Sequence, residues 1–269
     1  MTVAVENLGF GYPGKPIGRG VSFDVGAGET VVLLGPNGSG KTTLFKTILG
    51  LLAPQEGAVA IANEPLARLS RRQIARKLGY VPQASAGFFP FTVLDTVLMG
   101  RTAHLGLFAT PGKRDRAVAE EKLASLGIQG IKDEPYTQIS GGQRQLVLIA
   151  RALAQEAAFL IMDEPTASLD FGNQVRVLDQ VRRLARAGIG VVLSTHDPDH
   201  AFVVGDRVAV IHEGRLYALG PPEEVVTADM LARVYGVDVE MHAIEVQVGD
   251  GRRVVKLSVP LSRPVTDLS

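Results

Sequence analysis

Apolar and polar positions in the first part of the chain follow the short periods of β structure. Residues 2–8 and 20–25 are rich in β-branched side chains, and a turn rich in Gly and Pro lies between them. Thr30–Leu34 is a continuous apolar run, which is typical of a strand buried on both faces. Residues 58–62 and Leu78–Val81 are further short strands, so this part of the chain is predicted to be rich in β structure.

Helical periodicity takes over in the middle of the chain. Strand signals fade between residues 84 and 156, which predicts a helical insert within an α/β core. Strands return at residues 158–162 and 190–194, and the helix between them makes a βαβ unit with parallel strands. A closing hairpin is expected at residues 206–212 and 215–219. The predicted helices are residues 41–51, 71–77, 92–100, 114–126, 142–155 and 173–187.

Residues 237–269 are predicted to form a separable C-terminal extension. Apolar residues alternate with polar ones in 244–248 and again in 255–259, and Gly-Asp-Gly at 249–251 supplies a turn. This pattern predicts a β-hairpin. The hairpin either packs on the core as a small sheet or regulates the rest of the chain.

The composition limits the class of protein. A length of 269 residues suffices for one large α/β domain with an insert, and 46% hydrophobic residues are ordinary for a globular core. The 28 basic residues cancel the 28 acidic ones, so no nucleic-acid partner is expected. The chain has no Cys, which excludes disulfides and Cys-ligated metals. No run predicts a membrane span or a secretory signal.

Residues 35–42 read Gly-Pro-Asn-Gly-Ser-Gly-Lys-Thr, a complete phosphate-binding loop between a buried strand and a helix. Its glycines let backbone N–H groups surround phosphates, and the helix N-terminus adds positive potential. Lys41 supplies a charge for the β- and γ-phosphates, and Thr42 offers a hydroxyl to Mg²⁺. The predicted ATP-binding residues in this region are Asn37, Gly38, Ser39, Gly40, Lys41, Thr42 and Thr43.

Polar residues also follow three other predicted strands. Asp163 and Glu164 end an apolar run, where Asp163 would hold Mg²⁺ and Glu164 would polarise the attacking water. His196 follows the strand at 190–194, at the sheet edge where open α/β folds bind ligands. The Gln83 amide, just beyond Leu78–Val81, can reach Mg²⁺ or the attacking water. The predicted catalytic residues are Glu164, His196 and Gln83, and the predicted metal ligands are Thr42, Gln83 and Asp163.

Single aromatic and His residues are ambiguous when taken alone. Tyr12 is predicted to stack on a purine because Pro and Gly after it make a loop tip, whereas Phe10 can be counted into the core. His196 is assigned a function because it is the third polar strand end facing one site, although a lone His is more often structural. Structural roles are assigned to His104, His200, His212 and His242.

A second anion-binding turn precedes the strongest helix. Ser140, Gly141, Gly142 and Gln143 place a glycine pair behind a Ser at the start of an apolar helical run. Two phosphate-binding devices in one small chain suggest a nucleotide held between two copies of it. The chain as a whole resembles the ATP-binding cassette (ABC) ATPases over about its first 230 residues. The motifs occur in that family's order: Tyr12, 35–42, Gln83, 139–143, Asp163 and Glu164, 168–170, and His196.

The resemblance implies a fold and an assembly. The implied fold is α/β, a P-loop NTPase core of ABC type with a mixed sheet and an N-terminal antiparallel β part. An ABC ATPase domain would span residues 1–236 with a helical subdomain at about 84–156, and the C-terminal extension would cover 237–269. The family's head-to-tail dimer would hold two ATP molecules, with Ser140 and Gly142 on the γ-phosphate bound by the other copy's Lys41 and Asp170 crossing the interface. Ile139 stands where the family usually has Leu, which keeps an apolar contact.

Softer matches narrow the branch of the family. Four further segments resemble ATPases of importers for ferric siderophores, haem, cobalamin and, in one branch, molybdate or tungstate. They are residues 142–145, 169–174 and 97–101 and the C-terminal tail. The resemblance implies polytopic membrane permease subunits and a substrate-binding protein as partners, and a peripheral place on the cytoplasmic face of the membrane. A soluble ABC ATPase of DNA repair, translation or cluster assembly, and an exporter ATPase, remain alternatives. The aromatic stretch 87–94 would lie partly in the core and partly in a groove for a permease helix.

Overall fold

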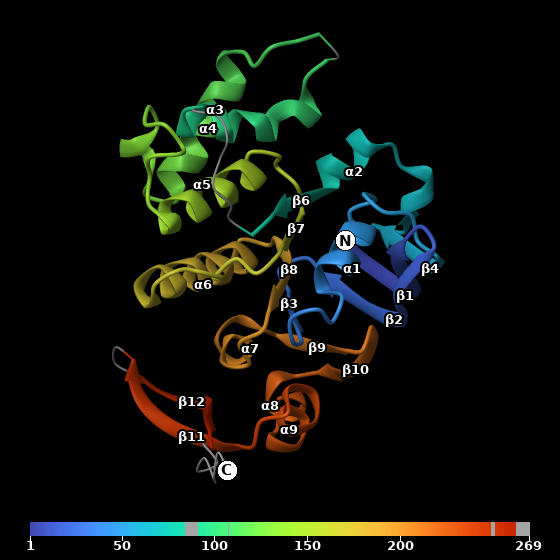
Figure 1. Cartoon of the computed structure of the whole chain (residues 1–269). Coiled ribbons are helices and arrows are strands. Elements are labelled where there is room, and N and C mark those ends of the chain that lie inside the picture. Colours follow the sequence, from blue (N-terminus) through green and yellow to red (C-terminus); the bar gives the residue numbers. More distant parts are fainter. Residues whose placement is uncertain (84–90, 107, 249–250, 262–269) are drawn as a thin grey trace, which may run out of the picture.

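Two sheets form the body of the molecule, and the α/β fold is confirmed. The computed structural model describes residues 1–83, 91–106, 108–248 and 251–261 (Figure 1). A four-stranded antiparallel sheet has the order β2-β1-β4-β5, and a six-stranded sheet has the order β10-β9-β3-β8-β7-β6. The antiparallel sheet contains β1 (Thr2–Tyr12), β2 (Lys15–Gly26), β4 (Glu56–Ile61) and β5 (Glu64–Pro65).

The six-stranded sheet places the candidate motifs at one edge. Neighbouring strands from β9 to β6 are parallel, and only β10 runs antiparallel to its neighbour. Parallel strands share a carboxyl edge, so the loops after β3, β6, β7 and β8 meet there. The strands are β3 (Thr30–Leu34), β6 (Leu78–Val81), β7 (Phe159–Met162), β8 (Gly190–Thr195), β9 (Arg207–His212) and β10 (Arg215–Gly220).

Helices cover the sheets and fill the middle of the chain. In Figure 1, α3, α4 and α5 gather at the end of the molecule away from the antiparallel sheet. The helices are α1 (Lys41–Ile48), α2 (Arg71–Lys77), α3 (Val93–Leu98), α4 (Lys113–Ser125), α5 (Gly141–Leu153), α6 (Phe171–Arg186), α7 (Asp199–Val204), α8 (Pro222–Val225) and α9 (Ala228–Tyr235). The last three were not anticipated. Within the described residues, no helix is long and apolar enough to cross a membrane.

The packing of β3 explains its continuous apolar run. Val32 and Leu34 belong to the core cluster that includes α3 to α6, whereas Val31 and Leu33 belong to the cluster formed with α1 and the antiparallel sheet. All four side chains are fully buried. Burying one such side chain stabilises the fold by roughly 1.5–3 kcal/mol. The strand that leads into the phosphate-binding loop is therefore held rigidly from both faces.

The predicted C-terminal hairpin is confirmed. β11 (Val239–Val248) and β12 (Gly251–Pro260) pair in antiparallel register along their whole length and form a separate two-stranded sheet. Figure 1 shows this hairpin beside the part of the core that contains α7 and β9. The extension therefore lies on the same side of the molecule as the loop that follows β8.

Candidate functional site

The loop between β3 and α1 depends on glycines for its shape. Gly40 has a φ of 100°, and a Cβ atom there would lie 3.0 Å from Ile17 Cγ2 and 3.1 Å from Phe10 Cε2. At Gly35, a Cβ atom would lie 2.3 Å from the carbonyl oxygen of Ile211. Only glycine permits this path without displacing backbone or buried rings. The loop therefore packs closely against β1, β2 and β9 on its way from β3 to α1.

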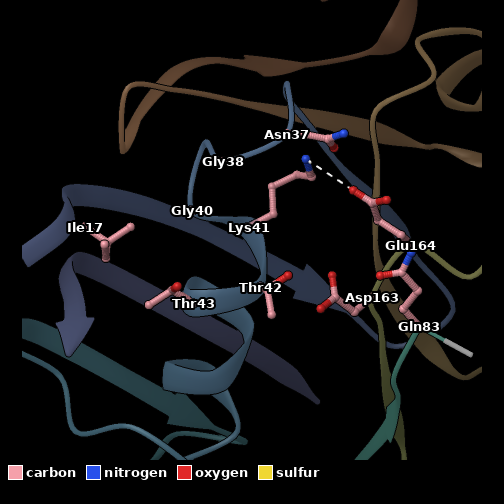
Figure 2. A pocket seen from close by; sticks show the side chains of 10 residues that line it. All are labelled: Ile17, Asn37, Gly38, Gly40, Lys41, Thr42, Thr43, Gln83, Asp163 and Glu164. Atoms are coloured by element: carbon pink, nitrogen blue, oxygen red, sulfur yellow. Dashed lines mark ion pairs between the residues drawn. The ribbon is translucent and has the colours of Figure 1, made fainter. Parts of the chain in front are cut away.

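Lys41 is held in place by the loop and by a carboxylate. Its Nζ donates to the carbonyl oxygens of Gly35 at 2.7 Å and Pro36 at 3.1 Å. The same atom lies 3.5 Å from Glu164 Oε1 (Figure 2). Burial lowers the pKa of Lys41, and the nearby carboxylate of Glu164 opposes that shift. A buried ammonium group bound by neutral carbonyls is suited to receive further negative charge.

Ser194 organises the two carboxylates at the end of β7. Its hydroxyl donates to Asp163 Oδ1 at 2.8 Å and accepts a hydrogen bond from the Glu164 N–H at 2.9 Å. Glu164 has a φ of +45°, a strained backbone conformation for a residue other than Gly. Its Oε2 lies 3.3 Å from His196 Nδ1. Sequence reasoning missed Ser194, although a polar residue within the apolar run of β8 was a usable signal.

Lys41, Asp163 and Glu164 line one cavity of about 420 Å³. Figure 2 shows the Thr42 hydroxyl directed toward Asp163, with Gln83 beside Glu164. The hydroxyl, carboxylate and amide oxygens are the donors that Mg²⁺ prefers, so the residues present fit this ion. We call this the P-loop cavity. Its described lining residues are Ile17, Asn37, Gly38, Gly40, Lys41, Thr42, Thr43, Gln83, Asp163 and Glu164.

One loop residue predicted from the sequence, Ser39, does not line the P-loop cavity. Ser39 is buried, and its hydroxyl has no hydrogen-bond partner among the described atoms. Ile17 on β2 lines the cavity instead, which sequence reasoning missed. Its signal was weak, because Ile17 stands between the predicted Gly- and Pro-rich turn and the strand predicted at 20–25, whereas β2 already begins at Lys15. The pairing of β2 with β1 brings Ile17 to the cavity.

Tyr12 lies at the end of β1, outside the lining of the P-loop cavity. It is 41% exposed, and the Lys46 ammonium lies 6.0 Å from its ring centroid and donates to its hydroxyl at 3.4 Å. Phe10 is fully buried, which confirms its assignment to the core. The Tyr12 ring is therefore partly exposed at the surface, and its hydroxyl is oriented by a cation on α1.

The turn Ser140–Gln143, which we call the signature turn, caps α5. The Gln143 N–H donates to Ser140 Oγ at 3.3 Å, and the Ser140 N–H donates to Gln143 Oε1 at 2.9 Å, a reciprocal capping box. A Cβ atom on Gly142 would lie 2.3 Å from Asn173 Cγ. Asn173 in turn donates its N–H to Asp170 Oδ1 at 2.8 Å, so Asp170 caps α6.

The signature turn and Asp170 therefore form one packed unit that is distinct from the P-loop cavity. None of the described residues that line this cavity comes from Ser140, Gly141, Gly142, Gln143 or Asp170. Within one chain the structure brings together Thr42, Gln83, Asp163, Glu164 and His196. It leaves the signature turn, Asp170 and Tyr12 elsewhere.

Two other sequence interpretations can be placed. His200 is buried on α7, and its Nδ1 lies 3.1 Å from Thr195 Oγ1. The Nε2 of His104 lies 2.8 Å from the Gln155 carbonyl oxygen. Both contacts fit the structural roles assigned to these two residues. Half of the aromatic stretch 87–94, including Phe88 and Phe89, lies outside the described residues. Phe91 is 48% exposed, while Val93 on α3 is buried in the core.

A buried strand, a glycine-rich loop and a helix, facing a strand that ends in paired carboxylates, define a P-loop nucleoside triphosphatase. The chain belongs to the ABC transporter family, whose model matches residues 19–167. It is accordingly an ATP-binding ATPase subunit of that family.

The similarity to individual proteins extends over most of the chain. An uncharacterized ABC transporter ATP-binding protein of Haemophilus influenzae is 41% identical and aligns over 90% of this chain and 92% of its own length. The hemin import ATP-binding protein HmuV of Streptomyces coelicolor is 39% identical over 85% of this chain and 81% of that protein. An inward-facing structure of a metal-chelate type ABC transporter superposes with a TM-score of 0.83 at 31% identity, covering 97% of this chain and 98% of the other.

Proposed function

We propose that this chain is the ATPase subunit of an importer for a metal chelate such as haem, a ferric siderophore or cobalamin. The observation that carries this proposal is the likeness to a metal-chelate type transporter over 97% of the chain, which includes the C-terminal hairpin. The hemin import relative supports the same cargo class. Molybdate or tungstate as cargo stays a prediction from the sequence.

The P-loop cavity is the proposed site of ATP hydrolysis. Lys41 and the N–H groups of residues 37–41 would bind the phosphates, and Thr42, Asp163 and Gln83 would hold Mg²⁺. The ion, when bound, would neutralise phosphate charge. Glu164 would accept a proton from the attacking water, and His196 would orient that water and the γ-phosphate. The contact of Glu164 with both Lys41 and His196 supports this assignment.

A second copy of the chain is the proposed partner that completes the site. The signature turn and Asp170 lie outside the P-loop cavity of their own chain, which supports their action on the ATP of a second copy. We also propose the division into an ABC ATPase domain at 1–236, its helical subdomain at about 84–156, and the extension at 237–269. The permease subunits and a substrate-binding protein would complete the transporter at the cytoplasmic face of the membrane.

Reconstitution tests the transport function directly. The chain is co-expressed with the permease subunits encoded beside it, and the complex is placed in liposomes with the ATPase subunit outside. We expect ATP-dependent movement of haem or a ferric siderophore from the lumen to the outside medium, because the lumen then stands for the external side. Glu164→Gln should abolish it. Movement of the chelate in the opposite direction would favour an exporter, and failure to purify with any membrane subunit would favour a soluble ABC ATPase.

A further inference from the structure

The C-terminal hairpin reaches the segment that carries His196. The backbone N–H and the hydroxyl of Ser258 on β12 both donate to Asp199 Oδ1, each over 2.9 Å. Asp199 is the first residue of α7 and follows His196 by three positions. A strand from the far end of the chain therefore makes a two-donor contact with a carboxylate next to the proposed catalytic centre.

Hydrogen bonds continue from this carboxylate toward His196. The Asp199 N–H donates to Asp197 Oδ1 at 2.9 Å, and the Asp197 N–H donates to Thr195 Oγ1 at 3.1 Å. Asp197 Oδ2 also lies 3.4 Å from His200 Nε2. Hydrogen bonds thus hold the residues on both sides of His196 in place. Asp199, which Ser258 contacts, is the last residue in this series of hydrogen bonds.

The His196 side chain itself has little else to orient it. It is 51% exposed, and its contact within the described residues is with Glu164 Oε2 at 3.3 Å. Its direction is therefore determined mainly by the backbone of residues 195–199. Small displacements of a catalytic group lower reaction rates strongly, because the reacting atoms must be aligned.

A second contact comes from the same C-terminal part of the chain. The Tyr235 hydroxyl at the end of α9 is shielded from solvent and has no hydrogen-bond partner among the described residues. Burial raises the pKa of Tyr235, and the Asp197 carboxylate adds to this shift. The Tyr235 phenol is thus close enough to the carboxylate of Asp197, the residue after His196, for the two groups to interact.

We propose that Ser258 and Asp199 are positioning residues, through which the C-terminal hairpin holds His196 in place for ATP hydrolysis. This rests on the proposed function, in which His196 and Glu164 act on the γ-phosphate. The hairpin would then contribute to catalysis by positioning His196, in addition to packing on the core. ATP binding itself depends on the P-loop cavity, which Ser258 does not line.

Amide hydrogen exchange of the full-length, nucleotide-free chain tests the contact without reference to activity. In Ser258→Ala, the amides of Asp197 and Asp199 should exchange several-fold faster than in the wild type, because their hydrogen bonds open more often. Val259→Ala, an exposed neighbour on β12, should leave both rates unchanged. The Val191 amide, bonded to the Glu29 carbonyl in the sheet, serves as an internal reference. Unchanged exchange at Asp197 and Asp199 would overturn the proposal.

Steady-state kinetics of the full chain with Mg²⁺ and ATP test the catalytic consequence. Ser258→Ala should lower kcat about two- to tenfold, the factor that corresponds to one hydrogen bond of usual net strength, with KM for ATP unchanged. Ser258→Thr, which keeps both donors, should restore kcat. Asp199→Ala should lower kcat at least as much, and adding Ser258→Ala to it should cause no further loss, because both changes break the same contact.

The outcomes separate the inference from the proposed function. Faster exchange with wild-type kcat would leave only a structural contact and would overturn the positioning role. A loss of kcat that follows the melting temperature and also occurs in Val259→Ala would overturn it as well. An inactive wild-type chain, or a Glu164→Gln variant as active as the wild type, would count against the proposed function, while amide exchange would still decide whether the hairpin holds the His196 segment.

Discussion

The P-loop cavity and the signature turn are two anion-binding devices built in different ways. In the cavity, groups from the ends of three strands, β3, β6 and β7, converge, and its main cation, Lys41, already contacts Glu164 at 3.5 Å. In the signature turn, Ser140 and Gln143 satisfy each other, and Gly142 packs against Asn173. In the P-loop cavity, side chains of opposite charge line an open space. The second device forms a stiff turn whose polar groups satisfy each other, and none of its residues is among the described residues that line the P-loop cavity.

This difference indicates what each device needs from a ligand. The cavity has charged groups that would be rearranged when phosphate replaces the Glu164 carboxylate beside Lys41. The signature turn stands at the N-terminus of α5, whose positive potential favours an anion, and its shape is already set by the capping box. Catalytic change is therefore expected in the cavity, and recognition without rearrangement is expected at the signature turn.

The largest effect is expected from Glu164→Gln in the cavity. Removal of the proposed general base should lower kcat for ATP hydrolysis about 100- to 10,000-fold, while ATP still binds and holds two copies together. Turnover of ATP and the elution volume of the chain with ATP measure the two effects. Glu121→Gln, which alters an exposed carboxylate paired with Lys122 on α4, should change neither. Normal ATP turnover in Glu164→Gln would contradict the assignment of Glu164 as the general base.

The next test asks whether the two devices meet between chains. Ser140→Arg spoils only the signature turn and Lys41→Ala spoils only the cavity, so neither homodimer has an intact site. Random mixing makes about half of the dimers mixed, and each has one intact site of two, so about a quarter of the wild-type rate should return. If mixed dimers form and the rate stays at that of the parents, the two devices do not share ATP.

The local sequence pattern predicted many of the central residues of this site, but it did not predict the residues around them. β3, β6 and α2 have the bounds that the sequence predicts, and parallel strands bring the ends of β6, β7 and β8 to one edge. Ile17 and Tyr235 were not anticipated, because their places depend on sheet pairing or on a helix far along the chain. Hydrophobic periodicity shows which face of a helix or strand is buried. It does not show which distant helix or strand packs against that face.

A smaller effect should show whether Tyr12 belongs to the ATP site although it lies outside the cavity lining. Loss of a ring that stacks on adenine removes roughly 1–3 kcal/mol, so Tyr12→Ala should raise KM for ATP about five- to a hundredfold with kcat nearly unchanged. Tyr12→Phe keeps the ring and should retain most of the affinity. Should Ile17→Ala raise KM while Tyr12→Ala does not, the base rests on the cavity wall rather than on Tyr12.

The smallest effect separates capping from recognition at the signature surface. Asp170 caps α6 by accepting the Asn173 N–H at 2.8 Å, so Asp170→Ala should lower the free energy of unfolding by about 1 kcal/mol. Asn caps helices as well as Asp does, so Asp170→Asn should unfold like the wild type in urea followed by circular dichroism. The charge is nevertheless lost in Asp170→Asn. If this variant keeps wild-type stability and also wild-type ATPase activity, Asp170 is only a helix cap. If stability is kept while activity falls, the Asp170 carboxylate acts beyond its own helix, as expected of a residue that faces the ATP of a second copy.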